Sequence, residues 1–290
     1  MSHLTPAERA DFAACQAIHA KHGKSYYFAT RFFPEAQRLA TFALYAFFRI
    51  PDDIVDQTEA NNSAAAKTAL LNWKQAWEQA YQTGQSDHPV LRATAKTFHT
   101  YQIPFSYSEA FLGAMVQDTE KSRYATYQEL EHYMYGSAVV VGLMMTHVIG
   151  FSSEEALPRA QELGEAMQLT NFLRDIREDL EQRNRIYLPE EDLQRFGVTE
   201  EDLREHRMTD RMIALLRFEI DRCDRLYTQS ARGIPLLHPS GRKAVAIASR
   251  LYQEILRKIE GQSYNIFRKR ARTSTFEKAL LSLRVVYSIK

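Results

Sequence analysis

Apolar residues recur at helical spacing along most of the chain, whereas the apolar–polar alternation that is typical of strands is scarce. Three capping-box patterns, in which Glu follows three residues after a Ser or Thr, mark helix starts at Ser106, Thr126 and Ser274. The pattern predicts helices near residues 5–21, 35–60, 63–82, 88–101, 106–121, 127–149, 154–183, 209–231, 240–262 and 275–288. No linker rich in Gly, Ser or Pro divides the chain, so we expect one all-α domain over residues 1–290.

Composition and charge narrow the class of protein. Hydrophobic residues make up 45% of the 290 residues, which is enough for a sizeable core, and the net charge of +1 argues against a nucleic-acid partner. Cys15 and Cys223 lack the spacing of a metal site or a disulfide framework and predict free thiols in a reducing cytoplasm. The N-terminus lacks a signal-peptide stretch, and the longest apolar run, 138–145, is too short to span a membrane. We expect a soluble cytoplasmic protein, for which peripheral contact with a membrane and the oligomeric state stay open.

Two polar stripes carry the candidate chemistry, and each follows helical spacing while its flanks are apolar. They consist of Tyr45, Arg49, Asp52 and Asp56, and of Gln168, Asn171, Asp175 and Asp179. Like charges four residues apart disfavour a helix by a few tenths of a kcal/mol, so something should offset the repulsion. A divalent cation does so, because carboxylates that leave room for phosphate oxygens and water are the usual ligands of Mg²⁺.

Either stripe alone is more simply read as a solvated helix face with ion pairs. Two such stripes, each with its own cation in Arg49 or Arg174, favour the functional interpretation instead. If they face each other across a helical core, they form a site for a magnesium-bridged diphosphate. Pro51 lies inside the first stripe and is expected to kink that helix or to start a new turn.

The chain resembles the squalene and phytoene synthase family of head-to-head prenyl synthases. The resemblance covers nearly the whole length and rests on a set of motifs: His22-Gly-Lys-Ser25, Asp175-Ile-Arg-Glu-Asp179, Arg185-Ile-Tyr-Leu-Pro189, Phe196-Gly197 with Asp202-Leu203, and Tyr264. It implies a single-domain isoprenoid synthase (class I terpenoid synthase) fold with helices around a central cavity.

The resemblance also implies the activity and the residues that carry it. Two prenyl diphosphates bind in one cavity, and Mg²⁺, or Mn²⁺ in its place, is held by Asp52, Asp56, Asn171, Asp175 and Asp179. Substrate contacts are expected from His22, Ser25, Tyr45, Arg49, Gln168, Arg174, Tyr187, Tyr264 and Arg268. The catalytic set is Asp52, Asp175 and Tyr133, with Tyr133 positioned for proton transfer. Aromatic faces such as Tyr45 and Tyr133 can steady an allylic cation.

The expected reaction joins two geranylgeranyl diphosphates through prephytoene diphosphate to give phytoene, without NADPH. The C30 relatives, which use farnesyl diphosphate to make dehydrosqualene, squalene or presqualene diphosphate, are the alternative. Ser137-Ala-Val139 departs from the Val-Ala-Gly that is typical of the family, and this bears on the product. Thr30 stands where C30 relatives tend to carry a large aromatic residue, which favours the longer substrate.

Three other classes of protein compete with this interpretation. Asn171, Asp175 and Asp179 match the metal spacing of a terpene cyclase, although that class usually carries Ser/Thr and Glu at the second and third positions. A non-catalytic helical scaffold is a further alternative. Glu129 and His132 have the spacing of a di-iron motif, but a second copy of that motif is missing from the sequence, which argues against it.

Overall fold

The computed structural model describes residues 4–23, 27, 28, 30–57 and 63–288, and for residues 56, 57, 275 and 286–288 it describes the backbone only. The predicted contacts of Ser25 and of the Asp56 carboxylate therefore lie outside the described residues and side chains.

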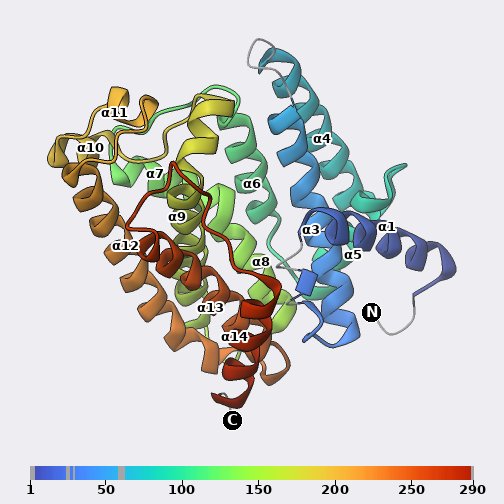
Figure 1. Cartoon of the computed structure of the whole chain (residues 1–290). Helices are drawn as coiled ribbons and strands as arrows, with labels where there is room; N and C mark the ends of the chain where they lie inside the picture. The colour runs from blue at the N-terminus through green and yellow to red at the C-terminus, as the bar shows by residue number, and fades with distance from the viewer. Residues whose placement is uncertain (1–3, 24–26, 29, 58–62, 289–290) are drawn as a thin grey trace.

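Helices make up the fold, as the apolar periodicity predicts, and the described residues form no strand beyond one isolated bridge between Phe151 and Leu237. The first half contains α1 (Pro6–His22), α3 (Glu35–Gln57), α4 (Ser63–Thr83), α5 (Pro89–Tyr101), α6 (Phe105–Gln117), α7 (Tyr127–Met134), the π-helix η2 (Tyr135–Val139) and α8 (Val140–Ile149). The second half contains α9 (Ala156–Arg183), α10 (Glu190–Phe196), α11 (Glu200–Arg204), α12 (Asp210–Ser230), the 3₁₀-helix η3 (Ala231–Leu236), α13 (Pro239–Gly261) and α14 (Thr275–Ser288). Figure 1 shows their arrangement.

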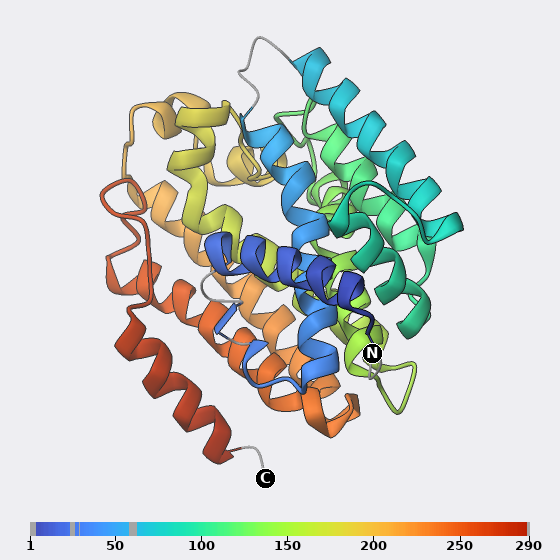
Figure 2. The ribbon, with the colours of Figure 1, turned by 90° about the vertical axis from the view of Figure 1, so that its right-hand side faces the viewer.

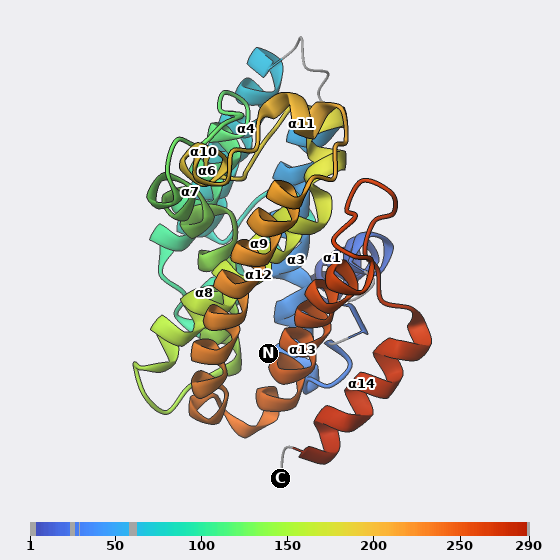
Figure 3. The same ribbon diagram turned by 60° about the vertical axis from the view of Figure 1, so that its left-hand side comes forward.

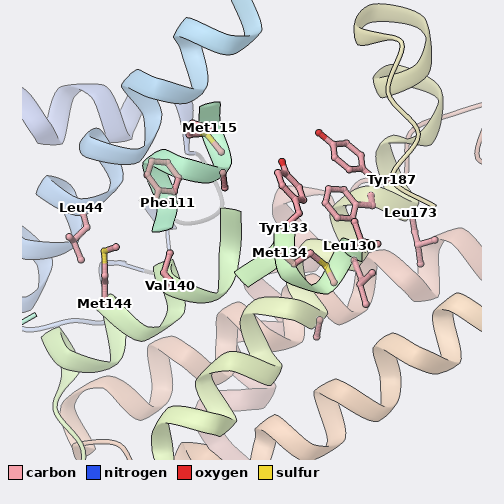
Figure 4. Packing of buried hydrophobic residues seen from close by; sticks show 14 of the residues in the cluster. Leu44, Phe111, Met115, Leu130, Tyr133, Met134, Val140, Met144, Leu173 and Tyr187 are labelled. Atoms are coloured by element: carbon pink, nitrogen blue, oxygen red, sulfur yellow. The ribbon is translucent and has the colours of Figure 1, made fainter. Parts of the chain in front are cut away.

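The long helix α9 is the centre of the bundle. It packs against α8, η2, α12 and α13, while α1, α3 and α5 pack on one another and α3 also contacts α8. In Figure 1 the blue α1 and α3 lie on the right of the bundle, across from the orange and red α12 and α13 on the left. One cluster of buried hydrophobic residues reaches from Leu4 to Ala271 and includes the side chains shown in Figure 4. This arrangement confirms the predicted all-α fold.

The predicted helix over residues 127–149 is interrupted by the π-helix η2. Gly136 lies in η2 so close to α6 that a Cβ there would come within 2.6 Å of the Ala110 carbonyl oxygen. Across the bundle, a Cβ at Gly164 would come within 2.9 Å of the Val139 Cα. Single π-turns inside α-helices often mark functional sites, and here one is wedged between two close helix neighbours.

Some of the predicted local features are confirmed and others are wrong. Ser274 and Glu277 form the predicted capping box, in which each backbone N–H donates to the other side chain, at 2.7 and 3.2 Å. The prediction at Ser106 is wrong, because α6 already begins at Phe105 and has no side-chain cap. Pro51 does not end α3, which continues to Gln57. Cys15 and Cys223 are free and buried, as predicted.

Within the described residues, every helix is too short or too polar to cross a membrane.

Candidate active site

A cavity of about 1020 Å³ lies inside the bundle, at the upper end of the range for ligand pockets. Its wall comes mainly from α3, α8, α9 and α13, and on one side from the segment 265–274 between α13 and α14, which we call the strap. One end of the wall is charged, with carboxylates and arginines from α3, α9 and the strap. The other end is mostly apolar, apart from Arg159, and includes a small separate cluster of buried residues: Phe33, Ile149, Ala156, Leu237 and Ala244.

The α3 stripe faces the cavity, as predicted for Tyr45, Arg49 and Asp52. Arg49 Nη1 lies 2.6 Å from Asp52 Oδ2, and its Nη2 pairs with Asp53. The Tyr45 ring stacks on the buried His19 ring, with centroids 3.9 Å apart. Burial raises the pKa of Tyr45 to about 12, so its phenol is neutral and presents an aromatic face to the cavity.

The α9 stripe lines the same cavity, with Gln168, Asn171, Arg174, Asp175 and Asp179 all in its wall. Arg174 makes a bidentate contact with Asp175, in which Nε donates to Oδ1 at 2.8 Å and Nη2 donates to Oδ2 at 2.5 Å. Burial opposes ionisation of Asp175, but hydrogen bonds and charge from arginines outweigh it and hold the pKa of that carboxyl below its usual value. Burial, and then the charge on Asp175, raise the pKa of Asp179 to about 7. Residues of both stripes therefore line one cavity.

A second arginine reaches Asp175 from the strap. Arg270 donates to both carboxylate oxygens at 2.7 and 2.8 Å and also lies 3.1 Å from Glu178. Arg270 belongs to the basic run in which Arg268 was the predicted substrate contact. Arg268 is exposed and outside the cavity wall, and its backbone N–H donates to Asn265 Oδ1 at 3.0 Å.

Tyr264 is likewise absent from the cavity wall among the described residues. Its backbone has φ = 63° just after α13, and the Arg217 guanidinium lies 5.1 Å from its ring centroid. The structure thus does not bring Tyr264 or Arg268 into the site, whereas His22 and Thr30 do lie in the cavity wall.

A buried aromatic group flanks the charged end. Tyr133 stacks on Tyr187, with ring centroids 5.7 Å apart, and Figure 4 shows the two side chains next to each other. The Tyr133 hydroxyl donates to Asp118 Oδ2 at 2.7 Å, and Arg185 donates to the Asp118 backbone oxygen at 2.7 Å. Burial, and then the charge on Asp118, raise the pKa of Tyr133 well above its usual value. Tyr133 is therefore a neutral phenol whose proton points at a carboxylate.

The donor set at the charged end suits a hard divalent cation, because it consists of carboxylate and amide oxygens. Asn171 Oδ1 is buried and has no hydrogen-bond partner among the described residues, while Asn171 Nδ2 lies 3.3 Å from Gln168 Oε1. Within that same part of the chain, no three His, Cys, Asp or Glu side chains are already gathered closely enough to hold a metal. Arginines pair with Asp52, Asp175 and Asp179 instead, so the residues fit a metal that arrives with an anionic ligand for those arginines.

The sequence analysis missed residues that come from outside the two stripes. Asp118 follows the end of α6, Arg270 lies in the strap, and His19 lies on α1, so helical spacing does not link them to the carboxylates. Arg185 stood within a recognised motif but without a role. The basic run 268–272 was a signal for Arg270, and only the choice of residue within it differed.

Comparisons with known proteins agree with this geometry. A family model described as squalene/phytoene synthase matches residues 19–277. A phytoene synthase from Arthrospira platensis is 35% identical over 95% of this chain and 93% of its own, and a 15-cis-phytoene synthase from Synechocystis is 35% identical over 93% of this chain and 82% of its own. A crystal structure of a dehydrosqualene synthase superposes with a TM-score of 0.89 at 31% identity and covers 97% of both chains.

A helical bundle around one long cavity, charged at one end and apolar at the other, defines an isoprenoid synthase fold. A squalene synthase from Alicyclobacillus acidocaldarius has this fold too, with a TM-score of 0.82 at 27% identity over 90% of this chain and 97% of its own. The chain belongs to the squalene/phytoene synthase family.

Proposed function

We propose that this enzyme condenses two prenyl diphosphates head to head, in a 1–1′ linkage, and that two geranylgeranyl diphosphates give phytoene through prephytoene diphosphate. The observation that carries the proposal is the polarity of the cavity along α9. Its wall changes from the apolar Ala156 to the charged Asp175 over 19 residues, about 28 Å of helix. A diphosphate at the charged end would place its isoprenoid tail along the apolar remainder.

The arginines at the charged end bind the diphosphates of the substrates. Arg49, Arg174 and Arg270 now neutralise carboxylates, and each has a planar fork that suits phosphate oxygens. Asp52, Asp175, Asp179 and Asn171, together with Asp56 as the sequence predicts, would hold Mg²⁺, or Mn²⁺ in its place. A bound cation supplies Lewis-acid and electrostatic stabilisation of the departing diphosphate.

The aromatic group keeps the resulting cation from water and takes up its proton. Tyr45 and Tyr133 present ring faces that can stabilise positive charge. Because the Tyr133 phenol resists ionisation, we propose that it accepts a proton and gives up its own proton in the same step. The allylic cation is attacked by the C2–C3 double bond of the second prenyl diphosphate, which forms one carbon–carbon bond and leaves a tertiary cation. The proton then lost from C1 of that second substrate goes to Tyr133 Oη, and the phenolic proton passes to Asp118 Oδ2 over the 2.7 Å hydrogen bond. The electron pair of the broken C–H bond closes the cyclopropane ring of prephytoene diphosphate, and NADPH has no role in phytoene formation.

The phytoene synthases named above support the C40 product, and the dehydrosqualene synthase structure keeps the C30 reaction with farnesyl diphosphate as the second candidate. Thr30 favours the longer substrate, because this small side chain is buried in the cavity wall, where a large aromatic ring would take up volume. The two free, buried cysteines fit an enzyme that works in the cytoplasm.

Parallel incubations with farnesyl and geranylgeranyl diphosphate, each with Mg²⁺ and with or without NADPH, test the proposal. We expect diphosphate release and phytoene from the C20 substrate, independent of NADPH. A C30 product as the main outcome would move the assignment to the second candidate. Release of diphosphate with a cyclised monomeric product would instead indicate a terpene cyclase, and no release from either substrate would contradict both enzyme assignments.

A further inference from the structure

The outer face of the C-terminal helix α14 is apolar and exposed. Phe276, Leu280 and Leu283 are 78%, 40% and 55% exposed, and they account for three of the six large hydrophobic residues that are exposed in the described chain. Their spacing of four and three residues places them within one narrow stripe of the helix. Phe32, Leu71 and Tyr135, the other three, come from different elements, as scattered surface hydrophobics usually do.

The opposite face of α14 packs against the rest of the protein. Ser282 is buried, Leu281 and Val285 are partly buried, and the helix packs against α13. Figures 2 and 3 show α14 at the edge of the bundle, with α13 on its inner side. The helix thus has two apolar faces, one that packs on the protein and one that the described residues leave uncovered.

The segment that leads into and contains this stripe is strongly basic in sequence. Residues 268–284 contain six Lys or Arg and a single acidic residue, Glu277, in a chain whose net charge is only +1. Glu277 is paired with Lys258 of α13, so its charge is compensated. Arg268, Lys269, Arg272 and Arg284 are exposed. An apolar stripe flanked by exposed cations has the composition of a helix that lies in the interface of an anionic membrane.

We propose that the outer face of α14, formed by Phe276, Leu280 and Leu283, docks the enzyme on an anionic lipid bilayer, with the exposed Arg284 on the same helix and the exposed Lys269 in the preceding strap. A second copy of the chain is a poorer occupant, because a symmetric contact would bring two clusters of like charge together. The position also suits a lipophilic substrate. Lys278 on the inner side of α14 and residues 270–273 of the strap belong to the cavity wall, so the docked face lies about one helix diameter, roughly 10 Å, from the cavity. This use of the surface rests on the proposed function, but the docking itself does not.

Sedimentation with sucrose-loaded vesicles tests the docking on the full chain without prenyl diphosphate or metal. Vesicles of phosphatidylcholine alone are compared with vesicles that also contain phosphatidylglycerol. We expect binding to the anionic vesicles to be tighter by about tenfold or more, and to weaken as salt is raised. Because no substrate is present, failure of the docking and failure of the proposed reaction give separate results.

Two variants separate the apolar and the basic contributions. The triple variant Phe276→Gln, Leu280→Gln, Leu283→Gln keeps good helix formers on an exposed face, so its thermal unfolding should match the parent while its vesicle affinity falls by about tenfold or more. The double variant Lys269→Gln, Arg284→Gln should lose the preference for anionic vesicles. Leu71→Gln on α4, which replaces another exposed leucine, is the matched control and should bind like the parent.

A fluorescent variant locates the contact. Phe276→Trp should be quenched by lipids brominated in their acyl chains, whereas the parent, whose Trp73 and Trp77 lie on α4, should not. The proposal is overturned if the parent ignores both kinds of vesicle, if the triple variant binds as well as the parent, or if the tryptophan at position 276 is not quenched. A parent dimer in size-exclusion chromatography that the triple variant abolishes would also overturn it, because a second copy would then cover the face.

Discussion

The Tyr133 hydroxyl and the Asp118 carboxylate share a 2.7 Å hydrogen bond between two buried side chains. Tyr133 lies on α7 and Asp118 directly follows α6, so the bond joins two elements at the cavity wall. In the proposed mechanism the carboxylate of Asp118 accepts the phenolic proton of Tyr133. If the two side chains form one proton path, removing either of them should have the same effect as removing both.

The first prediction tests this unit with Tyr133→Phe and Asp118→Asn. Each should lower kcat by about tenfold to a hundredfold, because each removes one half of the proton path. The double variant should be no slower than the slower single variant, since members of one unit are not additive. Steady-state kinetics on all four proteins measures this. Additive losses would show that Tyr133 and Asp118 act separately.

The second prediction concerns the carboxylates and metal. Asp52→Asn and Asp175→Asn should each lower turnover by orders of magnitude, and EDTA should remove the activity of the parent. Their effects on stability should differ. The Asp52 side chain is 46% exposed, so its loss should cost less than about 1 kcal/mol. Asp175 is 14% exposed and holds two arginines, so its loss should cost about 3 kcal/mol. Urea unfolding and activity assays separate the two effects, and activity that survives EDTA would contradict the metal assignment.

The third prediction uses Arg49→Lys. Arginine spans Asp52 and Asp53 with its two terminal nitrogens, whereas lysine keeps the charge but loses the fork. We expect kcat/KM for the prenyl diphosphate to fall by about tenfold or more. Arg250→Lys, an exposed position on α13, is the control and should leave kcat/KM unchanged. Equal kinetics for both variants would remove Arg49 from the site.

The fourth prediction concerns chain length and Thr30. This residue is 3% exposed, lies in the cavity wall and donates its hydroxyl to the Tyr27 carbonyl oxygen at 2.7 Å. Thr30→Phe should fill cavity volume and shift the preference from geranylgeranyl to farnesyl diphosphate. Thr30→Val keeps the volume but loses the hydrogen bond, and should leave the preference as it is. Competition between the two substrates measures the shift; a parent that already prefers farnesyl diphosphate would favour the C30 reaction.

The fifth prediction concerns stability against pH. Glu219 is buried beside Arg222 and Asp192, and burial, which outweighs the attraction of Arg222, raises its pKa from 4.5 to about 7. The folded chain therefore holds this proton more tightly than the unfolded chain, and stability should fall as pH rises from about 4.5 to 7, by at most about 3 kcal/mol. Glu219→Gln should flatten that part of the pH profile in urea unfolding. Asp221→Asn, exposed on the same helix, should not; an unchanged slope in Glu219→Gln would contradict the assignment.

The sequence predicted the helices and both polar stripes, because periodicity within one helix determines which residues share a face. It could not place Asp118 or Arg270, since their contacts depend on how distant segments pack. The same limit explains why Tyr264 and Arg268 were wrongly expected in the cavity wall, because their positions depend on how the chain turns after α13. The π-helix η2 also escaped prediction, because it depends on the close approach of α6 to Gly136.

The 28-residue helix α9 fixes the distance between the two ends of the cavity. The same rigid rod carries the charged residues at one end and Ala156 at the other, so the distance between them cannot change without breaking the helix. Inserting one residue would turn every later side chain by about 100° and take the carboxylates out of the cavity. Product length in this enzyme can therefore evolve through the size of the side chains along the cavity. It cannot evolve through insertions or deletions within α9, because these would displace the carboxylates.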